Sequence, residues 1–328
     1  MLQFVRYFKP SWRMLFSPRV HVSNPKNAFS TESTCMRLVP LSHRSVVQVQ
    51  GRDSLKLLQG LLTNDMTLLS KTNVIYSMVL NVQGRVECDV LIYNGEENEY
   101  LVECDTEAVE KITQLLRRYK LRSKVKFELL QDVKTYCLFS EPERINKISI
   151  GNLYKDPRLP DLGHRILTRT NTDDLLKNLK THADVNVEPI VSYVETRYKL
   201  GISEGVAEVD NAIPLEHNIV FLNGVSFNKG CYIGQELVAR AHHTGVIRKR
   251  IMPLRFLTNS VMATPGCHIL NQKEKRIGKV IGRNGEYGIG LMRLKEAFNE
   301  KTEFHIQAHD KIRVDVKKPK WWPDDLKY

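Results

Sequence analysis

The stretch at residues 229–236 reads KGCYIGQE and carries more information than any other part of the chain. It stands inside the run VSFNKGCYIGQELVARAH at 225–242. After Gly230 the apolar spacing predicts a helix, which would place Cys231 in the first helical turn. There the free backbone N–H groups, the positive end of the helix dipole and the cation of Lys229 would all favour a thiolate. The thiolate is the form of cysteine that attacks electrophiles or binds metals.

Two interpretations of Cys231 stay open on the residues alone. Gly230 permits a close backbone approach or an unusual dihedral. Gln235 lies one turn further on, and Glu236 and Arg240 are spaced for an i,i+4 ion pair that would fix the helix. A buried structural cysteine explains this pattern as well as a reactive thiol does, because no histidine or second cysteine is fixed nearby. Further ligands for iron or a cluster would have to come from elsewhere in the fold or from a partner.

Other short motifs do not define a site. The six cysteines, at 35, 88, 104, 137, 231 and 267, form no C-x-x-C pair, which excludes a local zinc ribbon or thioredoxin-like motif. We expect most of them to be small buried apolar residues. The G-x-S-x-G match at 201–205 follows a helical pattern, whereas a hydrolase nucleophile elbow follows a strand. The adjacent His242 and His243 favour a surface or ring-stacking role over metal binding, since nothing nearby has ligand spacing.

The charge of the chain is concentrated at its start. The 328 residues carry a net charge of +12, and residues 1–30 hold five Lys or Arg without any Asp or Glu. This acid-free, amphipathic segment is typical of a mitochondrial transit peptide, placed at 1–32, and a disordered basic arm is the alternative. The remaining excess is spread over the chain with no aromatic-basic stripe, so DNA is not indicated and RNA is disfavoured. No apolar run approaches the ~20 residues of a membrane span.

The pattern along the chain predicts an α+β protein with a β-rich end. Strand-like runs and helical periodicities mix irregularly up to about residue 248, which argues against a Rossmann array. The strands are expected at 45–50, 74–80, 86–93, 100–104, 124–130 and 135–139, and the helices at 54–62, 106–119, 172–179 and 190–200. Asp53 is expected to cap the first of these helices, with Leu55, Leu58, Leu61 and Leu62 on its buried side. From residue 250 onward, short strands broken by Gly and Pro predict a small β-barrel or sandwich. The basic cluster at 317–320 reads as part of a solvated tail.

The run KGCYIGQE resembles the signature of the folate-binding YgfZ branch of the glycine-cleavage T-protein (aminomethyltransferase) family. Further pieces agree in order: LQGLLTND at 58–65, LNVQGR at 80–85, LRSKV at 121–125, DPRL at 156–159 with LGHR at 162–165, and IPLE at 213–216. The resemblance covers about residues 38–318. With the transit-like N terminus it is similar to the mitochondrial iron–sulfur cluster assembly members of that family.

The resemblance implies a glycine-cleavage T-protein-like fold, with two α+β portions around a central cavity and a C-terminal β-barrel. The implied boundaries are 36–132, 133–248 and 249–318, with a tail at 319–328. A tetrahydrofolate-like ligand would occupy the cavity near Asp89, Arg197 and Glu204. A surface salt bridge is the alternative role for Arg197 and for Glu204. The motif residues implied to matter are Lys229, Gly230, Cys231, Tyr232, Gly234, Gln235, Glu236 and Arg240.

The resemblance also implies a role in the mitochondrial matrix. The implied role is a late step in the maturation of four-iron, four-sulfur proteins such as aconitase and lipoate synthase, with an indirect effect on haem synthesis. A-type iron–sulfur scaffold proteins are the implied partners, and Cys231 would hold a transient cluster whose other ligands the partner supplies.

The alternative is a folate-dependent one-carbon or aminomethyl transferase, so whether the chain is an enzyme stays open. The family's enzymes carry an Asp-Asp pair after the first hairpin turn, where this chain has Cys88-Asp89. The loss of one carboxylate weighs against aminomethyl transfer.

Overall fold

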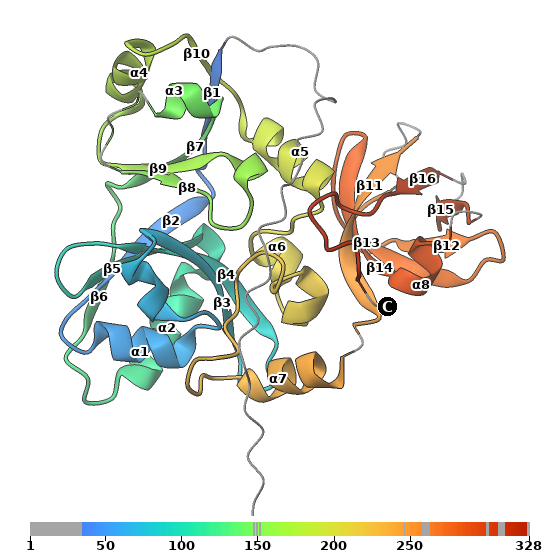
Figure 1. Cartoon of the computed structure of the whole chain (residues 1–328), viewed down its shortest axis with the longest axis horizontal. Helices are drawn as coiled ribbons and strands as arrows, with labels where there is room; N and C mark the ends of the chain where they lie inside the picture. The colour runs from blue at the N-terminus through green and yellow to red at the C-terminus, as the bar shows by residue number, and fades with distance from the viewer. Residues whose placement is uncertain are drawn as a thin grey trace, which may run out of the picture. The chain divides into compact units, whose positions relative to one another are not determined.

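The computed structural model describes residues 35–146, 148, 150, 152–245, 247–257, 263–299, 302–307 and 312–326. The predicted transit peptide at 1–32 lies outside this range. Cys35–Tyr328 forms one compact unit, whose packed elements are two sheets with their helices and a barrel (Figure 1).

The first sheet has five antiparallel strands. Their order is β3 (Val74–Leu80), β4 (Val86–Asn94), β5 (Glu99–Asp105), β2 (Arg44–Gln50) and β6 (Lys126–Leu129). Alternate side chains of these strands enter two different hydrophobic clusters, as the period of two in a strand requires. One cluster is closed by α1 (Ser54–Leu61) and α2 (Val109–Lys120), with η1 (Met66–Ser70) and η2 (Thr106–Ala108) beside them.

The helix α1 differs in detail from its prediction. Leu55 was expected on the buried side with Leu58, but it is 42% exposed, and Leu57 is buried in its place. Asp53 precedes the helix without capping it, because its carboxylate accepts a hydrogen bond from the backbone N–H of Lys124 at 2.7 Å.

The second sheet also has five strands. Their order is β10 (Val185–Val187), β1 (Met36–Pro40), β7 (Lys134–Phe139), β9 (His164–Thr168) and β8 (Leu153–Lys155). The strand β1 pairs in parallel with β10 and antiparallel with β7. The start of the described chain therefore belongs to the second sheet, although the sequence boundaries put it with the first portion. The short helices beside this sheet are α3 (Pro142–Ile145), η3 (Pro160–Leu162) and α4 (Thr172–Lys180).

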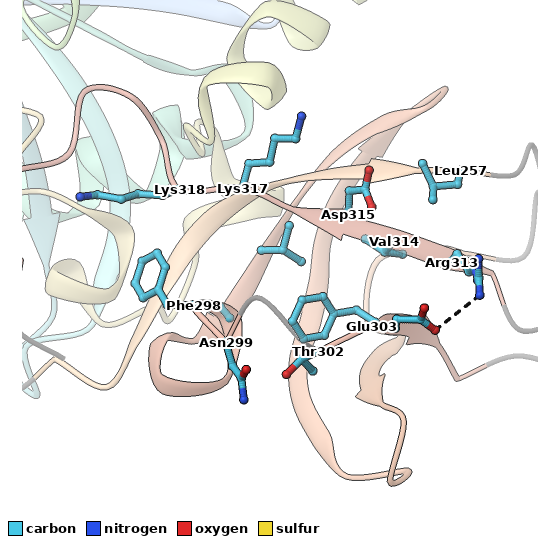
Figure 2. A pocket seen from close by; sticks show the side chains of 13 residues that line it. Leu257, Phe298, Asn299, Thr302, Glu303, Arg313, Val314, Asp315, Lys317 and Lys318 are labelled. Atoms are coloured by element: carbon cyan, nitrogen blue, oxygen red, sulfur yellow. Dashed lines mark hydrogen bonds and ion pairs between the residues drawn. The ribbon is translucent and has the colours of Figure 1, made fainter. Parts of the chain in front are cut away.

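The predicted C-terminal barrel is confirmed as a closed one. Its strands run in the order β11 (Lys249–Phe256), β14 (Tyr287–Arg293), β13 (Arg276–Asn284), β12 (His268–Asn271), β15 (Phe304–Ile306) and β16 (Arg313–Val316), with α8 (Leu294–Ala297) after β14. A cavity of about 530 Å³ opens beside β16, where Glu303 and Arg313 form an ion pair (Figure 2). The helix α5 (Ile190–Leu200) contacts both the barrel and β1.

The residues after the barrel are not a solvated tail. Trp322 is only 3% exposed and belongs to the barrel's hydrophobic cluster. The indole N–H of Trp321 donates to the carbonyl of Leu200 at 2.9 Å. Lysines 317, 318 and 320 are exposed as expected, but the tryptophan pair that follows them anchors this segment.

Candidate functional site

The loop that carries KGCYIGQE is irregular over 229–234. The helix α7 (Gln235–Thr244) begins at Gln235. The predicted start directly after Gly230 is therefore wrong: the helix begins about one turn later. Gly234, with φ +78°, precedes it in the left-handed region. Cys231 thus lies outside the helix, and the argument that the helix dipole favours its thiolate does not apply.

Lys229 anchors this loop instead of assisting the thiol. Its Nζ donates hydrogen bonds to the backbone carbonyls of Gln59 and Leu62, both at 2.7 Å, and of Asn64 at 2.8 Å. These carbonyls lie at and just beyond the C-terminal end of α1, where acceptors lack helical partners and a cation is favoured. The ammonium also lies 5.0 Å from the centre of the Tyr232 ring. Burial lowers the pKa of Lys229 to about 8.

A second anchor joins the loop to the β3–β4 hairpin. A Cβ on Gly234 would lie 2.5 Å from the carbonyl oxygen of Asn81 and 2.9 Å from Cα of Gly84. The backbones therefore approach more closely than any other residue type would allow. At Gly230, by contrast, a Cβ would meet nothing within 4 Å. The close approach expected of Gly230 belongs to Gly234.

The rest of the motif packs around these anchors. Tyr232 is buried, and the N–H of Ile233 donates to the carbonyl of Gly60 at 3.1 Å. The side-chain oxygen of Gln235 accepts a 3.4 Å hydrogen bond from the N–H of Tyr232. The predicted pair of Glu236 with Arg240 is confirmed.

Both members of that pair are exposed, so it contributes only about 0.5 kcal/mol. The stacking role suggested for His242 is also confirmed: its ring lies 3.7 Å from that of Phe227.

Cys231 is the exposed cysteine of the described chain. Cys88, Cys104 and Cys137 are buried, while Cys35 and Cys267 are partly buried. Within the described ranges no group of three or more His, Cys, Asp or Glu side chains could hold a metal ion. A metal bound at Cys231 would therefore need ligands from another molecule.

The three residues expected near a folate meet in a buried ion-pair network. Oε2 of Glu204 accepts hydrogen bonds from Arg158 at 2.7 Å, from Arg165 at 3.0 Å and from the hydroxyl of Tyr193 at 2.7 Å. Burial alone would raise the pKa of this carboxyl, but Arg158, Arg165 and Arg44 hold it well below its ordinary range.

Asp89 and Arg197 are equally committed to protein partners. Asp89 accepts from the N–H of Gly205 at 2.8 Å and from Arg44 at 3.4 Å. Arg197 donates to Glu208 at 2.9 Å. Asp89, Arg44 and Arg197 are buried, and Glu208 is partly buried. Asp89 joins the first portion of the fold to the second through Gly205, whereas Arg197 pairs within the second portion.

Sequence reasoning missed several members of this network. Arg158 and Arg165 lie in stretches that match the family in order, which was a usable signal. Arg44 and Tyr193 stand in no motif, and only the folded chain brings them to Glu103 and Glu204.

A cavity of about 680 Å³ lies between the two sheets, next to this network. It opens between the edge strands β3 and β8, which both contribute to its wall. Tyr76 and Arg158 line it, whereas Asp89, Arg197 and Glu204 do not. The hydroxyl of Tyr76 is buried and has no hydrogen-bond partner among the described residues.

None of the helices within the described ranges has the length and apolar character to span a bilayer.

Comparisons with known proteins agree with this architecture. Residues 24–138 match the model of the GCVT N-terminal domain, and residues 248–324 match that of the CAF17 C-terminal beta-barrel domain. A crystal structure of the glycine cleavage system aminomethyltransferase T from Bartonella henselae aligns with a TM-score of 0.71 and 16% identity, over 88% of this chain and 87% of that one. The chain therefore has the glycine-cleavage T-protein fold.

Two relatives align over most of the chain. The human protein named iron-sulfur cluster assembly factor IBA57, mitochondrial, is 33% identical over 95% of this chain and 93% of its own length. A protein from Mycosarcoma maydis, named iron-sulfur cluster assembly factor IBA57 homolog, mitochondrial, is 36% identical over 89% of this chain and 86% of its own length. Sequence and fold together place this chain in the IBA57 family of mitochondrial iron–sulfur cluster assembly factors.

Proposed function

We propose that this chain is a mitochondrial matrix factor that acts late in the assembly of four-iron, four-sulfur proteins such as aconitase and lipoate synthase. An effect on haem synthesis would follow indirectly. The observation that carries the proposal is Cys231, an exposed thiol on a loop that two independent anchors fix. A reactive group held by buried supporting contacts meets its partner in one geometry.

The cargo requires a second protein. One exposed thiol cannot hold a cluster alone, since iron–sulfur clusters are held by several protein ligands. Among the described residues no three His, Cys, Asp or Glu side chains lie close enough together to hold a metal ion. We infer that an A-type iron–sulfur scaffold protein supplies the remaining ligands of a transient cluster at Cys231.

Complementation tests the proposal. Cells depleted of the protein should lose aconitase activity and protein lipoylation, and the wild-type chain should restore both. Cys231→Ser should fail to restore them, while Cys267→Ser, at a partly buried cysteine on the barrel side, should succeed. Full rescue by Cys231→Ser would overturn the role of the thiol.

Tetrahydrofolate-dependent one-carbon transfer is the second candidate. The cavity of about 680 Å³ beside Tyr76 and the aminomethyltransferase fold favour it. The engagement of Asp89, Arg197 and Glu204 with protein partners weighs against it. Both carboxylates and the terminal nitrogens of Arg197 already have protein partners, and among the described residues only Nε of Arg197 in this set lacks a hydrogen bond. Titration with tetrahydrofolate, followed by a formaldehyde-transfer assay, separates the two: binding without turnover supports the assembly role.

A further inference from the structure

A basic surface lies where α2 ends and the chain turns into β6. We call it the 117–126 patch, and it consists of Arg117, Arg118, Lys120, Leu121, Arg122, Lys124 and Lys126. Its side chains are exposed except for that of Lys120, which is partly buried. Many other surface cations of the described chain are ion-paired, such as Arg169 with Asp132 and Lys111 with Glu87.

The patch leaves its six cations without carboxylate partners. No described Asp or Glu lies within ion-pair distance of any of them. Asp53, across the fold, accepts a hydrogen bond from the backbone N–H of Lys124 at 2.7 Å and not from its ammonium. Glu128 on β6 is exposed and follows the patch. Unneutralised cations on one short turn create a local positive field.

Leu121 projects from the centre of this field. It is 85% exposed and adopts φ +46° with ψ −114°, a sparsely populated conformation that costs a bulky side chain about 1–3 kcal/mol. Glycine is the residue that adopts a positive φ without this cost. The fold thus holds an apolar side chain outward at a strained position, which is typical of functional sites.

Three simpler explanations cover only part of the pattern. Cations in the last helical turn complement the helix dipole, but Arg122, Lys124 and Lys126 lie beyond α2. Cores of protein interfaces are rich in aromatic side chains, Met and Arg and poor in Lys; the patch supplies three arginines, but the other three of its cations are lysines and it exposes no aromatic ring. Single-stranded nucleic acid needs exposed aromatic rings for stacking, and the aromatics here, Tyr119 and Phe127, are partly buried.

We propose that the 117–126 patch docks this chain on an anionic phospholipid surface. Lysines and arginines near such a surface gain about 1 kcal/mol each, and a single protruding apolar side chain adds insertion into the interface. The helix α1 links the patch to the Cys231 loop. Asp53, directly before this helix, accepts a hydrogen bond from the backbone N–H of Lys124 in the patch. Leu62, directly after the helix, accepts a hydrogen bond from the ammonium of Lys229 in the Cys231 loop. Eight residues of helix span about 12 Å, so docking at one end leaves the thiol loop at the other end free.

Vesicle flotation tests the proposal on the compact unit Cys35–Tyr328, so that the basic first residues cannot contribute. Wild type should bind vesicles of phosphatidylcholine with cardiolipin, should not bind pure phosphatidylcholine, and should be released by salt. Arg118→Glu with Arg122→Glu should lower the partition coefficient at least about tenfold. The matched control, Lys273→Glu with Arg293→Glu on the barrel, changes the net charge equally and should bind like wild type.

Leu121→Gly separates binding from folding. It relieves the strain at φ +46° and should raise the unfolding midpoint, yet it should weaken vesicle binding several-fold. Equal vesicle binding by the patch variant and its barrel control would overturn the proposal. So would a wild-type protein that does not bind cardiolipin vesicles, or that binds RNA or an acidic protein more tightly than the vesicles. Cys231→Ser should bind vesicles normally, so failure here is distinguishable from failure of the assembly role.

Discussion

Gly84 at the tip of the β3–β4 hairpin and Gly234 before α7 pack backbone against backbone. Both have φ +78°, and a Cβ on Gly84 would lie 2.8 Å from the carbonyl oxygen of Gly234. This contact joins two stretches that the sequence analysis singled out separately, LNVQGR and KGCYIGQE. The position of the Cys231 loop therefore depends on a turn far away in sequence.

Gly234→Ala should lower the free energy of unfolding by about 2–4 kcal/mol. The new Cβ meets backbone atoms that cannot move aside, and alanine is strained at this positive φ. Urea unfolding followed by circular dichroism measures the change. Gly230→Ala is the matched control, because its Cβ enters open space and should change stability by less than about 0.5 kcal/mol. Equal losses at both positions would contradict the packing described.

Lys229→Met should destabilise the chain by about 1–3 kcal/mol and loosen the Cys231 loop. The apolar side chain leaves the carbonyls of Gln59, Leu62 and Asn64 without their donor in a buried place. Hydrogen exchange of residues 229–234, together with urea unfolding, measures both effects. Lys56→Met, an exposed lysine on α1 itself, should change neither; unchanged exchange in Lys229→Met would show that the ammonium is not an anchor.

Part of the order of strands and helices could be predicted from local patterns. Alternation identified β2, strand-like apolar runs identified β3, β4 and β5, helical spacing identified α2, α4 and α5, and glycine and proline breaks identified the barrel. The short strands β1, β8, β9 and β10 of the second sheet were not predicted. The spacing of apolar residues predicted the wrong start for α7. The apolar pattern continues through residues 231–234, which form an irregular loop in the structure. Gly234 ends that loop through a contact with Gly84 that spacing cannot show.

Long-range partners explain the remaining errors. Lys229 precedes Cys231, which suggested help for the thiol, but its acceptors come from the end of α1. Trp322 follows three lysines, which suggested a solvated tail. In the structure its ring packs against the rings of Phe221 and Phe298. The resemblance implied a ligand site at Asp89, Arg197 and Glu204, but Arg44 pairs with Asp89, and Arg158 and Arg165 pair with Glu204.

Alkylation of the native protein should modify Cys231 first. Its side chain is exposed, whereas burial raises the pKa of Cys104 and of Cys137 to about 12 and keeps both thiols protonated and inaccessible. Mass spectrometry after a short treatment with iodoacetamide should find the label on Cys231. In Cys231→Ser the fast phase should disappear; rapid labelling of Cys104 in folded protein would contradict the burial.

His217 should make the chain less stable in mild acid. Burial lowers its pKa from 6.5 to about 4, and its Nδ1 lies 2.8 Å from the hydroxyl of Ser203. Between these values the unfolded chain binds a proton that the folded chain excludes, so the free energy of unfolding falls as the pH falls. Between pH 7 and pH 5, wild type should lose about 2 kcal/mol more than His217→Gln. Parallel pH profiles for the two proteins would contradict this.

Glu204→Gln distinguishes a structural carboxylate from a ligand-binding one. The amide cannot neutralise the guanidinium groups of Arg158 and Arg165, which stay buried, so the free energy of unfolding should fall by about 3–5 kcal/mol. Glu236→Gln removes an exposed partner of Arg240 and should cost less than about 0.5 kcal/mol. Urea unfolding of both variants gives the comparison. A stable Glu204→Gln that loses tetrahydrofolate binding would instead assign Glu204 to the ligand and favour the transferase alternative.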